Sequence, residues 1–196
     1  MWVEVCKYLN RRFISADTRV LEIGSGYGDF IGNIRAKERV AIEHNIFFRE
    51  YFDEYPGVTV HFLDASFVLE TLPESSFDSV FCSNYFEHFE VPEIQHQLGL
   101  ISNVLKNGGK LIVLQPNFQL CSKFYFDDWT HKAIFSHASF SDFLEVHGFH
   151  VDKCFKRFLP FSMKSRFPKF PLLIRMYLLS PWKPFAGQML VIASKK

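Results

Sequence analysis

Short apolar runs alternate with longer segments of mixed polarity along most of this chain. The runs are rich in β-branched residues, which is typical of buried strands, and they occupy 19–24, 39–43, 58–63, 77–83 and 110–116. Segments of roughly 15 to 25 residues separate them, which is the spacing of βαβ units. This order predicts a parallel sheet with right-handed crossovers.

Helical periodicity is clearest in two of the intervening segments. Apolar residues from Ile94 to Leu105 recur every three or four positions, and 107–109 (Asn-Gly-Gly) should stop that helix. A second helix is expected over 138–149, with Ser139 or Ser141 as its N-cap. Two late strands are expected at 150–158 and 188–194, so the whole pattern predicts an open, doubly wound α/β sheet.

A glycine-rich turn follows the first run, in the sequence "VLEIGSGYGDF". A dinucleotide fingerprint needs glycines at relative positions 1, 3 and 6, but Asp29 occupies the sixth position counted from Gly24. No Gly-Lys-Ser/Thr follows either, so a phosphate-binding P-loop is excluded. The turn therefore lets a ligand approach the backbone closely without the features that cradle a pyrophosphate.

Three carboxylates stand at the ends of the first three predicted strands. Glu22 should point toward the ligand crevice, where it would repel a pyrophosphate and attract an ammonium group. Glu43 stands where a carboxylate can bind ribose hydroxyls, and Asp64 could accept a hydrogen bond from an adenine amino group or simply cap the next helix. These acids suit a ligand with an amino-acid part, a ribose and an adenine.

At this point the sequence resembles the class I S-adenosylmethionine-dependent methyltransferases. The resemblance is carried in order by "LEIGSGYG", "AIEHN", "FLDAS", "FDSVFCSNYFEHF" and "VLKNGGKLIVLQPN", and it is closest to the branch that contains ubiquinone-biosynthesis methyltransferases. It covers about residues 18–150 and the last strand. It implies a Rossmann-like sheet of seven strands in the order 3-2-1-4-5-7-6, with strand 7 antiparallel. Asn107 departs from the proline common in the family, which affects only a turn.

The resemblance implies S-adenosyl-L-methionine as cofactor and S-adenosyl-L-homocysteine as product. The cofactor-binding residues that it implies, together with Glu22, are Gly24, Ser25, Gly26, Gly28, Glu43, His44, Asp64, Ala65, Asn84 and Tyr85. The glycines could instead only shape the turn, and Tyr85 could serve packing alone.

Two histidines are the candidate catalytic residues. Methyl transfer from a sulfonium mainly needs alignment, and a hydroxyl acceptor also benefits from a base. His88 follows the fourth strand, and His131 lies in a loop that resembles the family's histidine-containing active-site loop. Either could instead serve local structure, and Asp127 and Asp128 could orient a histidine or only cap a turn.

No metal site is expected from the sequence. His44, His61 and Asp64 lie on different strands without ligand spacing. The four cysteines form no CxxC pair, which favours reduced and mostly buried thiols. The chain start lacks a signal-peptide pattern and no apolar stretch could span a membrane, so we expect a cytoplasmic protein of one domain, 1–196.

Charge is distributed unevenly along the chain. Residues 1–152 hold 12 Lys/Arg and 21 Asp/Glu, whereas 153–196 hold 10 Lys/Arg and no acid. The segment 153–187 is an insert rich in Phe, Pro and cations that should cover the active-site mouth. It is either a packed lid with a solvated rim or a surface for peripheral contact with the inner membrane face, through aromatic residues and Lys164, Arg166, Lys169, Arg175 and Lys183.

We therefore expect a methyltransferase that acts on a small-molecule or glycan/lipid-linked acceptor, at oxygen, and that binds no nucleic acid. A non-catalytic module that binds S-adenosylmethionine and an NAD(P)-dependent reductase are the alternatives. Asp29, in place of the third fingerprint glycine, argues against the reductase.

Overall fold

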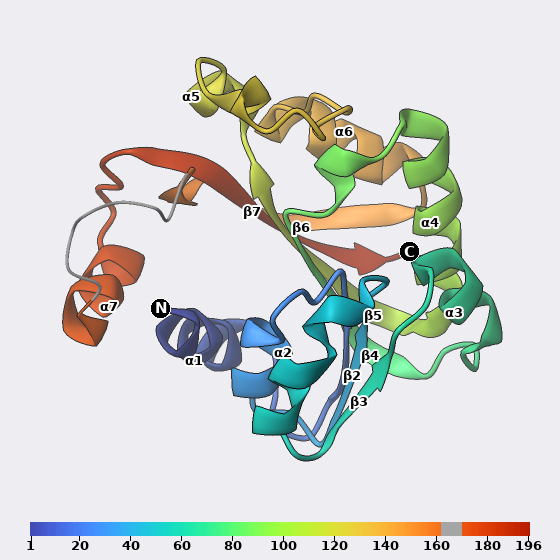
Figure 1. Cartoon of the computed structure of the whole chain (residues 1–196). Coiled ribbons are helices and arrows are strands. Elements are labelled where there is room, and N and C mark those ends of the chain that lie inside the picture. Colours follow the sequence, from blue (N-terminus) through green and yellow to red (C-terminus); the bar gives the residue numbers. More distant parts are fainter. Residues whose placement is uncertain (162–169) are drawn as a thin grey trace.

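The structure is a computed structural model that describes residues 1–161 and 170–196 (Figure 1). Among these residues, seven strands form one sheet in the order β3-β2-β1-β4-β5-β7-β6. The strands are β1 (Arg19–Ile23), β2 (Glu38–Ile42), β3 (Val58–His61), β4 (Phe77–Ser83), β5 (Leu105–Pro116), β6 (Phe149–Pro160) and β7 (Ala186–Lys195).

Strand direction confirms the predicted topology. The pairs β1–β2, β1–β4, β2–β3 and β4–β5 are all parallel, whereas β7 runs antiparallel to both β5 and β6. The expected doubly wound, Rossmann-like sheet with an antiparallel seventh strand is therefore present. Its register places Ile23 beside Ile42 and Cys82, so the turns after β1, β2 and β4 meet at one edge.

The helices connect these strands. They are α1 (Trp2–Arg12), α2 (Asp29–Asn33), α3 (Ala65–Thr71), α4 (Val91–Val104), α5 (Phe118–Cys121), α6 (His137–Val146) and α7 (Pro171–Leu179), with the 3-10 helices η1 (Ile46–Glu54), η2 (Phe86–His88) and η3 (Tyr125–Asp127).

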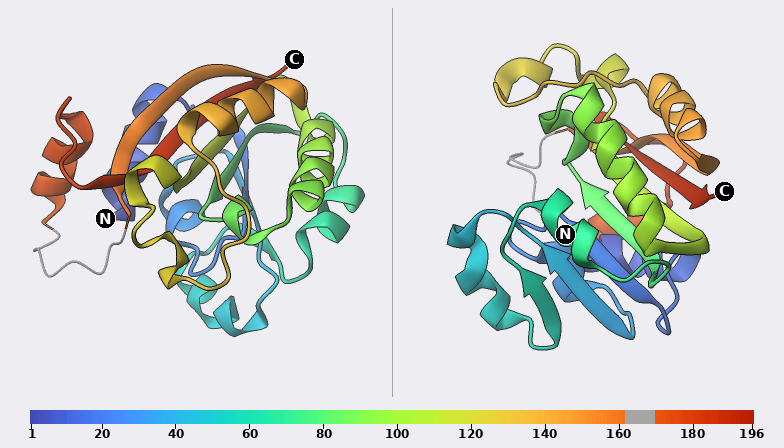
Figure 2. Two further views of the ribbon diagram at one scale, coloured as in Figure 1. Left: turned by 90° about the horizontal axis from the view of Figure 1, so that it is seen from above. Right: turned by 90° about the vertical axis from the view of Figure 1, so that its right-hand side faces the viewer.

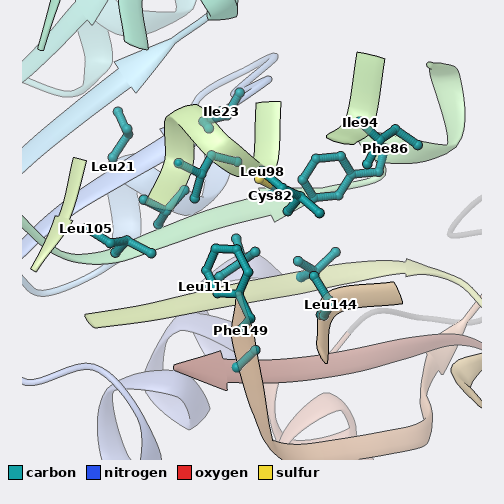
Figure 3. Close-up of a cluster of buried hydrophobic side chains, with 14 of the residues drawn as sticks. Leu21, Ile23, Cys82, Phe86, Ile94, Leu98, Leu105, Leu111, Leu144 and Phe149 are labelled. Atoms are coloured by element: carbon teal, nitrogen blue, oxygen red, sulfur yellow. The ribbon is translucent and has the colours of Figure 1, made fainter. Parts of the chain in front are cut away.

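Apolar side chains cover both faces of the sheet and bind the helices to it. Leu21 and Ile23 point to one face, where they pack with α3, α4 and α6. The alternate residue Val20 points to the other face, which α1, α2 and α7 cover. Figure 3 shows part of the first cluster, in which Leu98 and Leu144 approach the sheet from different helices. Burial on both faces explains why the parallel strands read as continuous apolar runs.

Two predicted helix ends differ from the structure. The helix that begins before Ile94 ends at Val104, and Leu105 already has extended geometry as the first residue of β5. Asn107 and the two glycines after it thus lie within an irregular start of that strand. Helix α6 begins earlier than predicted, because Ser136 is its N-cap and exchanges hydrogen bonds with Ser139 in a capping box.

The segment expected as an insert from residue 153 begins later. Its first eight residues belong to β6, which ends at Pro160. Helix α7 then lies beside α1 at the edge of the molecule (Figures 1 and 2), while Phe161 and Phe185 line a cavity described below. Cys6, Cys82 and Cys121 are buried and all four cysteines are free thiols, as predicted.

Candidate active site

The glycine turn forms a tight loop between β1 and α2. Gly24, Gly26 and Gly28 all have positive φ, at 69°, 52° and 73°, a backbone region that favours glycine. A Cβ at Gly24 would lie 2.6 Å from the Tyr85 ring, and one at Gly28 would lie 2.9 Å from the Phe52 ring. Nothing lies within 4 Å of the corresponding position at Gly26, so only this glycine faces open space.

Glu22 does not point into the crevice as the sequence suggested. Its side chain lies on the sheet face covered by α2, is 3% exposed, and accepts a hydrogen bond of 3.0 Å from the Ile31 amide. Burial raises the pKa of Glu22 well above its usual range. The residue anchors α2 to β1, and direct contact with a ligand stays a prediction.

Glu43 ties the end of β2 to the glycine loop. One carboxylate oxygen accepts from the Gly26 amide at 2.7 Å and the other from the Asn45 amide at 2.8 Å. The neighbouring His44 is largely exposed, with Nδ1 3.7 Å from the Glu43 carboxylate. Ser25 is buried, and its hydroxyl lies 3.4 Å from the Ile42 carbonyl oxygen. Glu43 therefore fixes the backbone of the glycine that faces open space.

Asp64 caps helix α3, the alternative that its position left open. Its Oδ1 accepts from the amides of Ser66 and Phe67 at 2.9 and 3.2 Å. Ala65, the first residue of the helix, is buried. Capping occupies Oδ1 alone, so the exposed carboxylate keeps Oδ2 for a further donor.

Asn84 and Tyr85 follow β4 and lie beside the glycine loop. Asn84 has a positive φ of 47°, its amide donates to the Leu114 carbonyl, and its Oδ1 accepts from Gln188 Nε2 at 3.1 Å. The Tyr85 ring packs on Gly24. These contacts set the path of the chain where the first half of the sheet meets the second.

A cavity of about 1070 Å³ opens next to this point. It extends from Asn84 past the ends of β5 and β7, and its walls come from η2, the segment after β5, and the two ends of the connection between β6 and β7. Exposed aromatic residues surround it, namely Phe124, Trp129 and Phe185. Its size and apolar rim suit an organic molecule.

His88 and His131, the candidate catalytic residues, lie next to each other at the wall of this cavity. Their ring centres are 5.0 Å apart. Nδ1 of His131 lies 2.7 Å from the Tyr125 carbonyl oxygen; because a carbonyl only accepts, Nδ1 carries the proton and Nε2 keeps its lone pair.

The ring of His88 is oriented by a chain of hydrogen bonds. The Thr130 hydroxyl donates to Oδ1 of Asp128 at 2.5 Å, and its oxygen accepts from Nδ1 of His88 at 2.8 Å. Nε2 is again the nitrogen with a lone pair. Burial, and then the nearby His131, lower the pKa of His88, which favours the neutral ring.

Glu87 completes this group, and its surroundings are unusual. It is 2% exposed, and neither carboxylate oxygen accepts a hydrogen bond of normal geometry from the described residues. Burial raises the pKa of Glu87 to about 8, an effect that the nearby backbone amides of Glu87 and Tyr85 offset only in part. One donor atom each from Glu87, His88 and His131 lies within 4.8 Å of the others.

Asp127 and Asp128 have different surroundings. Asp128 forms a turn with Thr130, the capping alternative, and through that hydroxyl it also orients His88. The Thr130 hydroxyl and amide hold the pKa of Asp128 below its usual range. Asp127 ends η3 and lines the cavity.

Sequence reasoning missed several residues of this site. Thr130 and Gln188 carry no motif, and they reach His88 and Asn84 from 42 and 104 positions away. Glu87 lies in the motif "FDSVFCSNYFEHF". The resemblance implies that its pair with His88 lies beside the active site, but it gives Glu87 no role of its own. A buried acid beside a histidine at a strand end is the signal for such a role.

Two of the five cations proposed to contact a membrane are among the described residues, Arg175 and Lys183. Lys164, Arg166 and Lys169 are outside the described residues. Lys183 donates to the Tyr177 carbonyl and lies over the Tyr177 and Phe158 rings, so it serves packing within the fold. Arg175 is exposed on α7. Among the described residues, no helix has the length and apolar character needed to cross a membrane.

Solved structures with the same fold are methyltransferases. A S-adenosylmethionine-dependent methyltransferase from Archaeoglobus fulgidus shares 24% identity and a TM-score of 0.69, over 100% of this chain and 95% of that one. A putative methyltransferase from Bacillus halodurans shares 16% identity, with a TM-score of 0.69 over 97% and 98%. A complex of the Trm112 methyltransferase activator with a putative methyltransferase from Haloferax volcanii contains a match with 15% identity and a TM-score of 0.71, over 99% and 89%.

Residues 20–109 match the family model described as a methyltransferase domain. The sheet order is the one expected from the resemblance to class I methyltransferases. No curated protein matches the sequence. The finer resemblance to the ubiquinone-biosynthesis branch stays a prediction.

Proposed function

We propose that this protein transfers the methyl group of S-adenosylmethionine to an oxygen atom of a small-molecule or lipid-linked acceptor. The observation that carries this proposal is the cavity of about 1070 Å³ that begins at Asn84, beside the glycine loop, and brings His88 and His131 to its wall. The cavity thus brings Asn84, one of the predicted cofactor residues, to the same space as two side chains that can accept a proton.

The residues present fit the predicted cofactor. Gly26 faces open space, and each oxygen of Glu43 keeps a lone pair beyond its bond to a backbone amide. In this proposal Gly26 lies against the methionine and ribose portion, Glu43 binds the ribose hydroxyls, and Asp64 with Ala65 binds the adenine. Exposed Ile46 and Phe67 follow β2 and β3 and offer apolar surface to the base.

The cofactor supplies an activated methyl group bound to a sulfonium sulfur. Transfer to an acceptor hydroxyl in the cavity would form a C–O bond and break the C–S bond, whose electron pair would stay on sulfur. The hydroxyl proton is taken up by Nε2 of His131 or His88, the nitrogens that the contacts with Tyr125 and Thr130 leave free to accept it. The chain therefore mainly aligns the reactants and removes one proton.

The acceptor class follows from the cavity rim and from helix α7. Aromatic residues around the mouth suit an apolar or aromatic acceptor. The outer surface of α7 exposes Leu172, Leu173, Met176 and Leu179. Beside it lies a pocket of about 220 Å³ whose lining includes Lys7, Arg11, Arg12 and Arg175. Apolar residues next to cations are typical of binding to anionic lipid surfaces.

Transfer of radiolabelled methyl from S-adenosylmethionine tests the reaction. Pools of phenolic, glycan and lipid-linked acceptors are incubated with the wild-type chain and with His131→Ala, and the labelled product is separated. We expect label on an oxygen and a loss of about 10²- to 10⁴-fold in rate for the variant. Label on nitrogen or carbon, or an unchanged rate for His131→Ala, would contradict the proposal.

A further inference from the structure

Two imidazoles and one carboxylate converge at the wall of the cavity, in an arrangement that the proposed proton transfer does not need in full. A single base would suffice, yet Glu87, His88 and His131 bring three donor atoms within 4.8 Å of one another. Glu87 and His88 are adjacent residues of η2, whereas His131 comes from the loop after η3. The sequence offered no recurrent ligand spacing, because the third residue is supplied by tertiary structure.

The surroundings of the Glu87 carboxylate indicate that it binds a ligand. It is almost fully buried, and neither oxygen accepts a hydrogen bond of normal geometry from the described residues. An unpaired carboxylate in such a place is strongly disfavoured if it is charged, as any buried and uncompensated ion is. A bound cation removes this cost, since it supplies both the charge and the coordination that the protein does not.

The histidines already have the form that a metal ligand requires. Nδ1 of His131 donates to the Tyr125 carbonyl, and Nδ1 of His88 donates to Thr130, whose hydroxyl is held by Asp128. In metal centres the ring nitrogen that does not bind the metal donates to a carbonyl or a carboxylate-linked group, which fixes the tautomer and directs the other nitrogen inward. Both Nε2 atoms are therefore available as ligands.

We propose that Glu87, His88 and His131 form a binding site for a divalent transition-metal ion such as Zn²⁺ or Mn²⁺. Two imidazoles with one carboxylate favour these ions over Mg²⁺ and Ca²⁺, which prefer oxygen ligands. Ligands about 2.1 Å from such an ion lie roughly 3.5 Å apart, so loading draws the three side chains inward.

The site is built like a catalytic centre and not like a closed structural one. Three protein ligands leave a position open, and all three residues line the cavity. Oδ2 of Asp128 lies 4.0 Å from Nε2 of His131 and can provide a further contact. Where the proposed methyl transfer holds, an acceptor hydroxyl bound to the ion would lose its proton to solvent more readily, and the ion would replace the histidine base. Metal binding itself does not depend on that reaction.

Titration of the metal-free full chain with Co²⁺ tests this site, because Co²⁺ bound to nitrogen and oxygen ligands absorbs visible light. The chain is first dialysed against a chelator, and Zn²⁺ is then added to displace Co²⁺. We expect one equivalent to bind. Glu87→Gln and His131→Ala should weaken binding by at least about tenfold, and Thr130→Val, which removes only the group that orients His88, by about tenfold. His96→Ala, an exposed histidine on α4, is the matched control and should bind as wild type.

Absence of a Co²⁺ spectrum, or equal affinity in all four variants, would overturn the proposal. Thr130→Val leaves Glu87, His88 and His131 unchanged, so it provides the test if the Glu87→Gln variant does not fold. Calorimetry with S-adenosylmethionine on the same preparations separates the two proposals. Normal cofactor binding without Co²⁺ binding would contradict only the proposed metal site. Co²⁺ binding without cofactor binding would contradict only the proposed methyl transfer.

Discussion

The three glycines of the first turn all have positive φ, but they differ in the space available for a side chain. Gly24 and Gly28 lie under aromatic rings, where a Cβ would clash. Gly26 faces open space, and its amide donates to Glu43. A substitution at Gly26 therefore changes the backbone and the surface offered to a ligand, while it leaves the packing of the protein unchanged.

Gly26→Ala is expected to weaken the binding of S-adenosylmethionine by at least about tenfold, or about 1.4 kcal/mol. Gly108→Ala is the matched control, because Gly108 also has a positive φ (71°) and open space around it, but lies at the start of β5, far from the turn in sequence. Both variants should lose about 1 kcal/mol of folding free energy through backbone strain. Calorimetry gives the affinities, and equal affinity in the two variants would contradict the role of Gly26.

Some residues of the site could be predicted because their role depends on local sequence, and others could not. Glycine spacing and the acids at strand ends indicate a cofactor site from the sequence alone. Thr130 acts on His88 only because the loop after η3 folds back onto η2, where the amides of Lys132 and Ala133 donate to the Glu87 carbonyl. Such contacts depend on tertiary structure, and no local pattern records them.

At the scale of elements, the strands were predictable because strands that are buried on both faces consist of continuous apolar runs. The ends of the helices were harder to predict. Ser136 caps α6 through reciprocal hydrogen bonds with Ser139, but the sequence offers other serines nearby that could serve as the N-cap. The helix α1 was not predicted; its signal is the helical spacing of Val5, Cys6 and Leu9, which bury against the sheet. The 3-10 helix η1 was not predicted either, although Asn45 offers an N-cap, since its side chain accepts from the Phe47 amide.

Asp78 joins three strands at the edge opposite the site, and its effect should depend on pH. Its carboxylate accepts from the Arg19 amide of β1 at 2.8 Å and from Nζ of Lys106 in β5 at 2.6 Å. Partial burial alone would raise the pKa of Asp78, but these hydrogen bonds and the Lys106 charge lower it below the usual 3.8. Because the folded-state pKa is the lower one, the stabilisation is present above about pH 4 and is lost as pH falls through the folded-state pKa.

Asp78→Asn should therefore lower the free energy of unfolding by about 1 kcal/mol at about pH 7, a value that allows for solvent screening. The loss should shrink at a pH below the folded-state pKa of Asp78, where the carboxyl group is protonated. Urea unfolding at these two pH values measures it, with Asp17→Asn at an exposed position as control. A loss of the same size at both pH values would show that the charge of Asp78 does not contribute.

At the scale of the whole molecule, one surface places exposed apolar residues next to cations, at helix α7 and the neighbouring α1. The last 44 residues carry ten cations and no acid, but part of this charge lies along β6 and part packs within the fold, as Lys183 does. The sequence therefore indicated an uneven distribution of charge along the chain, but not where the cations lie on the surface. The structure gathers exposed apolar residues on α7 and cations in the adjoining pocket against α1.

Binding to anionic vesicles should depend on the surface of α7. We expect the wild-type chain to sediment with vesicles that contain phosphatidylserine more than with neutral ones, and Leu173→Asp to reduce this binding by about tenfold, since it removes apolar contact and adds repulsion. Val146→Asp introduces the same charge at an exposed apolar position on α6 and should bind as wild type. Equal sedimentation with both vesicle types would contradict membrane contact.

A crystal structure of the chain with S-adenosylhomocysteine tests the central claim most directly, because the sulfur marks where the methyl group leaves. We predict the ribose on Glu43, the methionine portion against Gly26, and the sulfur at the Asn84 end of the cavity, directed toward His88 and His131. A ligand bound away from the glycine turn, or a sulfur facing a wall of the protein other than this cavity, would contradict it.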